Sequence, residues 1–397
     1  QQKIQQALTT CPFVVLQEAF RTTETCRFAD LLLPAASWGE KEGTVTNSER
    51  RISHVSQAIP APGQARADWA ITVDFAQRLE QRLRPGTPSL FAFDQPQALF
   101  DEYKQLTRER DLDLSGISYA VLDQQGPQQW PFPAGARTGT PRLYGDGIFP
   151  TESGRANFIA EPYRAAKELR DARFPLTLNT GRLRDQWHGM SRTGTAARLF
   201  GHVSEAVLSL HPDEMRRHRL QAGDLVSLKS RRGSLIVPVS SDDSVRPGQA
   251  FLPMHWGDRF LKGGVNVLTQ PAFDPLSKQP ELKHTGVRIE AVTLPWQLFA
   301  LVEGDVQAHL EALRPLCENF AYASLSLAGR ERPALLIRAA STQAPDNQLL
   351  TQIDQLLGLN EGPVLSYDDP RRSIGKRVRI ENGRITAIRL AGETIAQ

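Results

Sequence analysis

The stretch Leu178-Asn179-Thr180-Gly181-Arg182-Leu183-Arg184-Asp185-Gln186-Trp187-His188-Gly189 follows a short apolar run, residues 174–178, that is typical of a buried strand. Gly181 lets the backbone come close to a ligand, because glycine has no Cβ atom to clash. The neighbouring Arg182 offers a rigid fork of donors for a planar or anionic group, and phosphate is the foremost such group. Strand, glycine, arginine and then an aromatic pair together predict a cradle for a phosphorylated heterocycle.

A simpler interpretation of the same stretch is a glycine turn after a strand, with a surface arginine and a half-buried tryptophan. Short motifs of this kind often occur without a function. The local chemistry therefore leaves both interpretations open, and other parts of the chain have to decide between them.

Two further groups of motifs accompany this stretch. One lies downstream and comprises residues 252–256, 265–269, 274–277, 280–283 and 287–290. The other lies near the start and comprises residues 29–34, 38–43 and 47–51. Taken in their order along the chain, these two groups and the opening stretch resemble the molybdopterin oxidoreductases, the family of bacterial nitrate reductases and formate dehydrogenases. The likeness is greatest to the cytoplasmic assimilatory nitrate reductases.

The resemblance implies an α/β plus β-barrel architecture in four parts. Residues 1–85 would form the C-terminal part of a Rossmann-like α/β domain, and residues 86–170 an irregular connecting region. Residues 171–294 would form a six-stranded double-psi β-barrel that binds the molybdopterin dinucleotide. Residues 295–397 resemble the small α+β C-terminal domain of flavin-dependent nitrite and rubredoxin reductases. We expect this last module to bind a partner or to pack on the enzyme.

Hydrophobic patterns predict individual elements. Apolar runs at 13–16 and 31–33 are typical of strands that are buried on both faces of a parallel sheet. A hairpin is indicated by three consecutive segments: apolar and polar residues alternate in 225–230, a turn follows at 231–234, and an apolar run returns at 235–239. Asn382-Gly383 indicates a second hairpin. Helices are expected at 68–83, 99–106, 163–169, 298–313 and 347–357, and a strand is expected at 333–337.

The resemblance also implies contacts with two copies of molybdopterin guanine dinucleotide. The residues that it assigns to these contacts are Gln17, Glu18, Lys41, Asp68, Thr180, Gly181, Arg182, Trp187, His188, Gly189, His255, Trp256, Asn266 and Lys283. We expect the first four to converge in space, with Asp68 facing the guanine. Arg50 and Arg51 lie in a run that resembles the substrate funnel, where a guanidinium fork matches the planar nitrate anion. No catalytic or metal-ligating residue is expected in this chain.

Simpler roles remain open for these residues. Gln17 and Glu18 follow a predicted strand at the end where open α/β sheets bind ligands, but Glu18 also suits a solvated loop. Lys41 also suits a surface charge cluster, and Asp68 also suits a helix cap. The remaining alternatives are a packed core pair for His255 and Trp256, and surface arginines held by Glu42 and Glu49 for Arg50 and Arg51.

The resemblance implies an enzyme that reduces nitrate to nitrite at a Mo-bis(molybdopterin guanine dinucleotide) centre. Its electron donor would be a flavoprotein subunit, a ferredoxin or a flavodoxin. The family's cysteine motif for a [4Fe-4S] cluster and its molybdenum ligand have no match here, and the chain has neither an initiating methionine nor a signal peptide. We therefore expect the chain to begin inside a longer protein and to be inactive by itself. Formate is the alternative substrate, and a cofactor-free interaction module is the alternative to an enzyme.

The composition argues against other classes of partner. A net charge of +3 over 397 residues, without a block of like charge, does not indicate nucleic-acid binding. The apolar runs are far shorter than a membrane span. Cys11, Cys26 and Cys317 are too widely spaced for an iron–sulfur site or a disulfide framework. Few cysteines suit the reducing cytoplasm.

Overall fold

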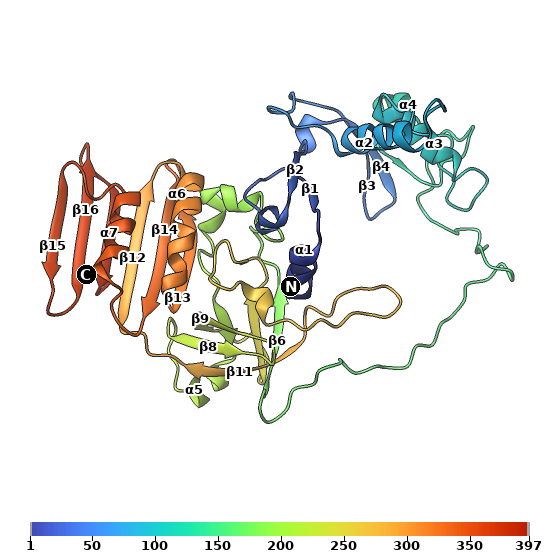
Figure 1. Ribbon diagram of the computed structural model, residues 1–397. Coiled ribbons are helices and arrows are strands. Elements are labelled where there is room, and N and C mark those ends of the chain that lie inside the picture. Colours follow the sequence, from blue (N-terminus) through green and yellow to red (C-terminus); the bar gives the residue numbers. More distant parts are fainter. Residues whose placement is uncertain (1, 395–397) are drawn as a thin grey trace. The chain divides into compact units, whose positions relative to one another are not determined.

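The computed structural model describes residues 2–394, which form two compact units. The smaller unit comprises Phe13–Arg21 and Ala29–Tyr163. The larger unit comprises the N-terminal segment up to Pro12, Thr22–Phe28 and the chain from Arg164 onward. Figure 1 shows the elements of both units, coloured along the chain. The boundaries of the four predicted domains stay a prediction.

The smaller unit combines two small sheets with three helices. β1 (Val15–Glu18) and β2 (Leu31–Pro34) are parallel, and β3 (Gly43–Thr46), β4 (Arg51–Val55) and β5 (Gln128–Gln129) form an antiparallel sheet. The helices are α2 (Asp68–Leu83), α3 (Pro96–Gln105) and α4 (Tyr119–Gln125), and η2 (Trp38–Glu40) is a short 3-10 helix. The buried core consists of Ile52, Phe100, Leu114, Ile117, Tyr119, Leu122 and Phe132.

The prediction that the first two strands are buried on both faces is wrong for this chain. Val15 is 48% exposed and Leu31 is 43% exposed. Their sheet has only two strands among the described residues, so few neighbouring side chains cover it. A continuous apolar run identified the strands and their parallel pairing correctly, but it did not identify what covers them.

The larger unit contains a closed six-stranded barrel, in the order β10-β6-β11-β8-β9-β7. The strands are β6 (Leu176–Gly181), β7 (Leu208–Leu210), β8 (Leu225–Lys229), β9 (Ser234–Ser241), β10 (Gln249–Pro253) and β11 (Thr285–Ala291). Two pairs, β6–β10 and β7–β9, are parallel. Val226, Leu228 and Val237 point into the core, because the predicted hairpin places alternate side chains inside. α5 (Pro212–Arg217) begins at His211, whose side chain caps it.

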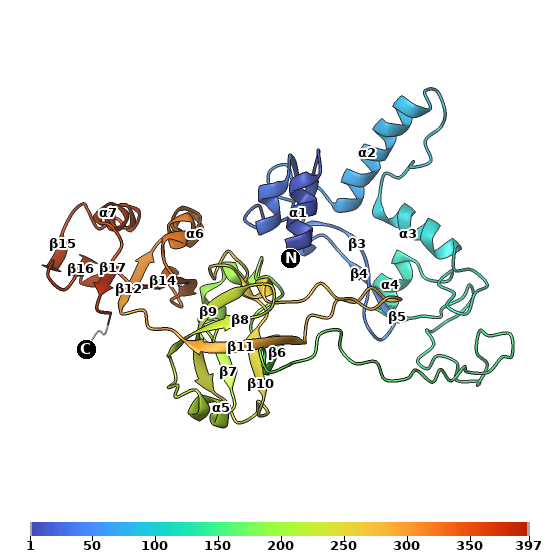
Figure 2. The ribbon, with the colours of Figure 1, turned by 60° about the horizontal axis from the view of Figure 1, so that its bottom comes forward.

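A six-stranded antiparallel sheet follows the barrel, in the order β13-β14-β12-β17-β16-β15. Its strands are β12 (Trp296–Glu303), β13 (Tyr322–Ala328), β14 (Ala334–Ser341), β15 (Val364–Asp369), β16 (Ile374–Glu381) and β17 (Arg384–Gly392). α6 (Val306–Leu313) and α7 (Asn347–Leu356) lie against the sheet (Figure 2). The predicted hairpin turn is confirmed, because Asn382 and Gly383 both have positive φ angles and join Glu381 to its partner Arg384.

One of the predicted helices is wrong in its first half, and another is wrong throughout. Residues 298–313 contain the end of β12 and then α6, because Leu298, Ala300 and Val302 alternate with more exposed residues. Gly304, with a φ of 128°, ends the strand, and Asp305 then caps the helix. The segment 163–169, predicted as a helix, has no regular secondary structure and bends at Lys167 and Glu168, and ion pairs of Glu168 fasten it to the barrel.

The C-terminal sheet packs on the barrel through one continuous core. Leu325 donates a backbone hydrogen bond to Phe260, and Lys262 donates one to Ala323. The Lys262 ammonium also donates to the carbonyls of Glu318 and Phe320 at 2.8 and 2.7 Å. The module was expected either to bind a partner or to pack on the enzyme. In the structure it packs on the barrel of the same chain.

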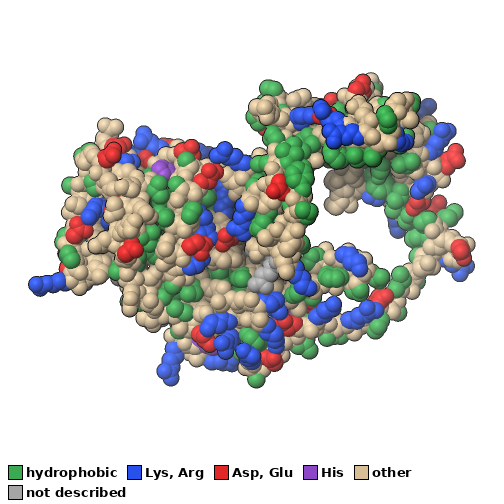
Figure 3. Space-filling view, viewed as in Figure 1, with side chains coloured by type: hydrophobic (Ala, Val, Ile, Leu, Met, Phe, Trp, Pro, Cys, Tyr) green, Lys and Arg blue, Asp and Glu red, His purple; other side chains and the backbone are tan. Residues whose placement is uncertain are grey.

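The surface carries both signs of charge. On the face that Figure 3 shows, basic and acidic side chains are interspersed over the larger unit. Among residues 2–394, no helix has the length and apolar character that crossing a membrane requires.

Candidate functional site

The end of β6 is closely packed. Gly181 lies opposite Pro253 of β10, and a Cβ atom at this position would stand 2.7 Å from Cε2 of Phe251. Thr180 is only 4% exposed, and its hydroxyl donates a 2.9 Å hydrogen bond to the carbonyl of Leu282. Glycine is thus required here by the packing of Phe251, whether or not a ligand also approaches this backbone.

Beyond β6, the chain presents a cation beside an aromatic surface. The Arg182 guanidinium lies over the Trp187 ring at 5.3 Å, and His188 meets the edge of that ring at 4.6 Å. All three side chains are exposed, as is Gly189. Within the described residues, the Arg182 guanidinium forms no hydrogen bond or ion pair, so its donors are available to an anion.

His255 holds this loop from inside. The imidazole is fully buried, its Nδ1 donates to the His188 carbonyl at 2.7 Å, and its Nε2 accepts from the Leu183 amide at 2.8 Å. Burial lowers the pKa of His255, which agrees with a neutral ring that both donates and accepts. Trp256 is also fully buried. The structure therefore places both residues in the core pair that the simpler interpretation describes.

A cavity of about 280 Å³ adjoins the Thr180–Leu282 contact. Asn266 lines it from η5 (Val265–Val267), together with Leu282, Thr269 and Gly257. α1 (Gln2–Thr10) and η1 (Glu24–Phe28), which belong to the same unit, complete the wall. Lys283 is exposed next to Leu282. The site residues expected from the sequence did not include Thr269 or Gly257, although Thr269 ends the motif 265–269 and Gly257 directly follows the motif 252–256.

Lys41 and Asp68 meet in the smaller unit, as expected. Their charged groups are 2.9 Å apart, and the Lys41 ammonium lies 5.6 Å from the Trp38 ring centroid. These residues line a cavity of about 420 Å³ with Phe100 and Tyr103. Asp68 is the first residue of α2, but the side chain at the N-cap position, Ala67, makes no capping bond. The Asp68 carboxylate binds Lys41 instead of the helix amides.

Gln17 and Glu18 occupy a different part of the same unit. They are the last two residues of β1, and neither is among the residues that line the Lys41–Asp68 cavity. The Glu18 carboxylate accepts from the amides of Ala19 and Phe20 at 2.8 and 3.1 Å. The structure thus brings together two of the four residues for which a common site was expected.

Arg50 and Arg51 bind backbone carbonyls. The Arg50 guanidinium donates to Trp130, Thr140 and Pro141, the last at 3.2 Å, and Arg50 itself has a φ of 63°. Arg51 donates to Pro127 at 3.2 Å and lies 3.7 Å from Glu49. Glu49 therefore holds one arginine, as the simpler interpretation expects. Glu42 holds neither, because it binds His54 instead.

The stability of the smaller unit is expected to fall as the pH rises above 6.5. The His54 ring is 10% exposed and lies 2.6 Å from Asp123 and 3.1 Å from Glu42. Burial alone lowers the pKa of His54, but these two carboxylates outweigh it and raise the pKa above 6.5. The folded state therefore binds the proton more tightly than the unfolded state. Its contribution is complete below pH 6.5 and disappears as the pH rises through the raised pKa.

Thermal unfolding at about pH 6 and about pH 9 would measure this effect against the variant His54→Gln, which has no titrating ring. The difference in Tm between the two proteins should shrink at the higher pH. A difference that stays constant or grows would contradict a charged His54 in the folded state.

Comparisons with known proteins bear on both cavities. Residues 1–78 match the family model described as Molybdopterin oxidoreductase, and residues 176–286 match the Molydopterin dinucleotide binding domain. The chain is 36% identical to the nitrate reductase of Klebsiella oxytoca, over 83% of this chain and 38% of that protein. It is 34% identical to the F420-dependent formate dehydrogenase subunit alpha of Methanocaldococcus jannaschii, over 73% of this chain and 40% of that protein.

Among solved structures, acetylene hydratase from Pelobacter acetylenicus aligns with a TM-score of 0.50 and 16% identity, over 74% of this chain and 42% of that chain. Likeness at this level concerns the fold alone, and it agrees with the mixed α/β and barrel architecture. The chain spans about two fifths of the length of each of these three proteins. Among residues 2–394, no group of three or more histidine, cysteine or acidic side chains is arranged to hold a metal ion.

Proposed function

The chain belongs to the molybdopterin oxidoreductase family, and we propose that it forms the dinucleotide-binding walls of a cytoplasmic assimilatory nitrate reductase. The complete enzyme would reduce nitrate to nitrite and hold Mo-bis(molybdopterin guanine dinucleotide). When bound, this cofactor supplies the two-electron oxygen-atom transfer. The residues of this chain bind and orient its two dinucleotides.

The observation that carries the proposal is the exposed Arg182 over Trp187 at the end of a barrel strand. A guanidinium that has no partner in the protein suits the pyrophosphate of a dinucleotide, and the adjacent ring offers a flat surface to a base or a pterin. Asn266 and Lys283, near the Thr180–Leu282 contact, add a donor and a charge. These residues fit one dinucleotide.

The second dinucleotide is assigned to the Lys41–Asp68 cavity. A carboxylate accepts from both N1–H and the exocyclic amine of guanine, and this role suits Asp68. Lys41 suits a phosphate or the pterin. The ion pair between them is partly exposed, with side-chain exposures of 25% and 53%, so a ligand that offers both charges better partners can replace it. Gln17 and Glu18 would contact the ligand outside this cavity.

The remaining features of the complete enzyme belong to the same proposal. A [4Fe-4S] cluster and the molybdenum ligand would come from a part of the enzyme other than this chain. The electron donor would be a flavoprotein subunit, a ferredoxin or a flavodoxin. Of the two funnel arginines, Arg51 is the better guide for nitrate, because the Arg50 donors are already engaged by three carbonyls.

Formate is the second candidate substrate, because a formate dehydrogenase subunit is 34% identical over 73% of the chain. Assays of the complete enzyme with nitrate and with formate, each with a suitable redox dye, would separate the two candidates. Either result leaves the dinucleotide sites of this chain unchanged.

Arg182→Ala is expected to weaken dinucleotide binding in the complete enzyme by about 10- to 150-fold, because a charge-assisted hydrogen bond contributes about 1.5–3 kcal/mol. The measurement is molybdenum and pterin content per protein after purification. Arg330→Ala, which removes an exposed arginine outside both cavities, is the matched control. Full cofactor content in Arg182→Ala would refute the assignment of Arg182 to the dinucleotide site. Absence of molybdenum and pterin from the unchanged complete enzyme would favour a cofactor-free interaction module.

A further inference from the structure

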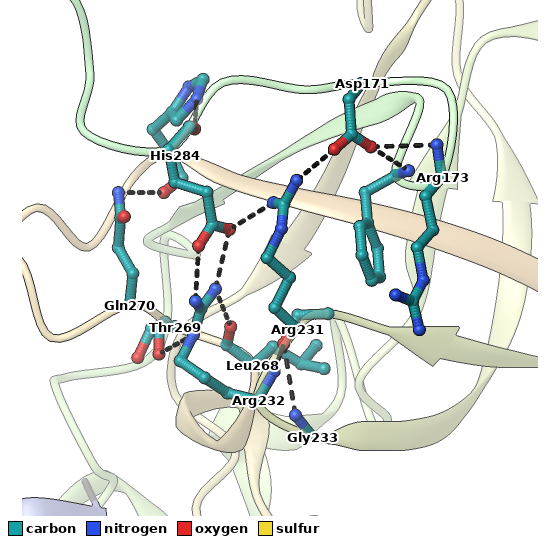
Figure 4. A network of polar contacts seen from close by, with 12 residues as sticks. Asp171, Arg173, Arg231, Arg232, Gly233, Leu268, Thr269, Gln270 and His284 are labelled. Atoms are coloured by element: carbon teal, nitrogen blue, oxygen red, sulfur yellow. Dashed lines mark hydrogen bonds and ion pairs between the residues drawn. The ribbon is translucent and has the colours of Figure 1, made fainter.

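Arg232 joins two segments of the larger unit that are far apart in the sequence (Figure 4). Arg232, in the turn between β8 and β9, donates to both carboxylate oxygens of Glu168 at 2.6 and 2.9 Å. Its Nε donates to the carbonyl of Thr269 at 3.0 Å. Arg231 adds a second ion pair to Glu168 at 3.1 Å. One carboxylate thus receives two guanidinium groups, and one of these also holds the loop that contains Thr269.

The backbone of Glu168 holds the far end of the same loop. The Nε2 of His284 donates to the Glu168 carbonyl at 2.8 Å, and the Gln270 side chain donates to the His284 carbonyl at 3.1 Å. Gln270 is only 6% exposed, so this bond is shielded from water. Both ends of the loop 269–284 are therefore fastened to Glu168, directly or through one residue.

This loop forms part of the cavity wall. Thr269 and Leu282 line the cavity with Asn266, and the Leu282 carbonyl receives the hydroxyl of Thr180. Arg232 does not line this cavity, but it binds the Thr269 carbonyl. His284 stands two residues after Leu282. The Glu168 network thus fixes the residues at both ends of the segment that would touch the dinucleotide.

The chemistry of the network makes it rigid. The Glu168 and Arg232 side chains are 16% and 20% exposed, and a bidentate guanidinium–carboxylate pair fixes both position and orientation. The hydrogen bonds from Arg232 hold the pKa of Glu168 below its usual range, so the pair stays charged at neutral pH. Few side-chain torsions can change without breaking at least one of these bonds.

We infer that Glu168 and Arg232 are positioning residues for the barrel dinucleotide: they hold the loop 269–284 in the shape that closes the cavity wall. The inference rests on the proposed function, since it names residues that support that site without touching the ligand. Residues that orient the ligands of a metal ion change affinity by about 10- to 100-fold when they are replaced, and we expect an effect of similar size here.

The test uses Glu168→Gln in the complete enzyme. This change keeps the size of the side chain and one acceptor but removes the charge that attracts both arginines. The expected result is at least about tenfold faster loss of pterin from the enzyme during dilution. Trypsin should also cut the loop faster after Lys278 and Lys283, and this readout does not depend on activity. Arg232→Lys, which keeps the charge but loses the fork, should give a smaller change in both.

The matched control is Lys229→Ala, which breaks a 2.8 Å ion pair with Glu290 on the same barrel; neither of these residues lines the cavity. Its pterin loss and loop cleavage should equal those of the unchanged enzyme. If Glu168→Gln and Arg232→Lys lower Tm but leave pterin loss and loop cleavage unchanged, the pair is only a scaffold and the inference is overturned. If cleavage rises while Arg182→Ala retains all its pterin, the loop is held as inferred but the proposed dinucleotide site fails.

Discussion

His255→Ala is expected to lower the free energy of unfolding of the larger unit by about 3–5 kcal/mol. Two contributions add up to this loss, and the two broken hydrogen bonds contribute more than the cavity that alanine leaves. The buried imidazole satisfies the His188 carbonyl and the Leu183 amide at once. Alanine leaves both groups without a partner, and each such group costs up to about 1–3 kcal/mol where it is shielded from water. The truncation also leaves a cavity. Chemical denaturation measures the sum.

The same substitution should release the loop that presents Arg182, so pterin content should fall together with stability. His202→Ala is the control, because that side chain is 56% exposed and has one ion pair, at 3.7 Å from Asp185. We expect the control to change stability by less than about 0.5 kcal/mol. An unchanged denaturation midpoint in His255→Ala would show that the two hydrogen bonds do not hold the loop.

The stability of the unchanged protein should depend on pH in the way that a buried, neutral His255 requires. Burial lowers the pKa of His255, so below pH 6.5 the unfolded chain binds a proton more readily than the folded chain. The contribution of His255 is therefore present above pH 6.5 and is lost as the pH falls. Its direction is opposite to that of His54, whose pKa is raised.

Short sequence patterns correctly predicted those turns, hairpins and helices whose conformation depends mainly on residues that are adjacent in the sequence. The Asn382-Gly383 turn formed because both residues tolerate positive φ, and the hairpin of β8 and β9 formed because its residues alternate. Helix α2 begins and ends within the predicted range 68–83. In each case the deciding residues are adjacent in the sequence, so no distant contact was needed.

Elements that depend on distant contacts were not predictable in the same way. Residues 296–303 are mostly apolar, with Glu303 as their only charged residue, and this composition fits a helix or a strand. The neighbours β14 and β17 decide in favour of a strand. Residues 163–169 could form a helix by composition, but Arg231 and Arg232 hold Glu168 in a segment without regular secondary structure. The competing interaction comes from more than sixty residues away.

The candidate site shows the same division. The sequence named Lys41 and Asp68 together although they are 27 residues apart, because the motifs of a family were available as a guide. It could not show that His255 and Trp256 point inward, since burial depends on the loop that covers them. It also could not show that the Arg50 guanidinium is engaged by carbonyls some 80 to 90 residues away.

Asp354→Ala is expected to destabilise the C-terminal sheet and its helices by about 3–5 kcal/mol, because it leaves a buried guanidinium without its carboxylate. Arg389 on β17 and Asp354 on α7 have side-chain exposures of 3% and 8%. Two hydrogen bonds of 2.6 and 2.7 Å join them, and Arg389 also donates to the Gly375 carbonyl at 3.0 Å. The pair therefore fastens a helix to the sheet through a desolvated contact.

Two further variants separate the value of the pair from the cost of breaking it. Asp368→Ala breaks an ion pair with Arg377 in which the carboxylate is 52% exposed, and it should cost less than about 1 kcal/mol. The double variant Asp354→Leu with Arg389→Met should recover most of the stability lost in Asp354→Ala, because replacing both charges by apolar groups removes the unpaired charge. Urea denaturation of all three would measure these differences. If the double variant is as unstable as Asp354→Ala, the attraction between the two charges, and not the desolvation of an unpaired one, holds α7 against β17.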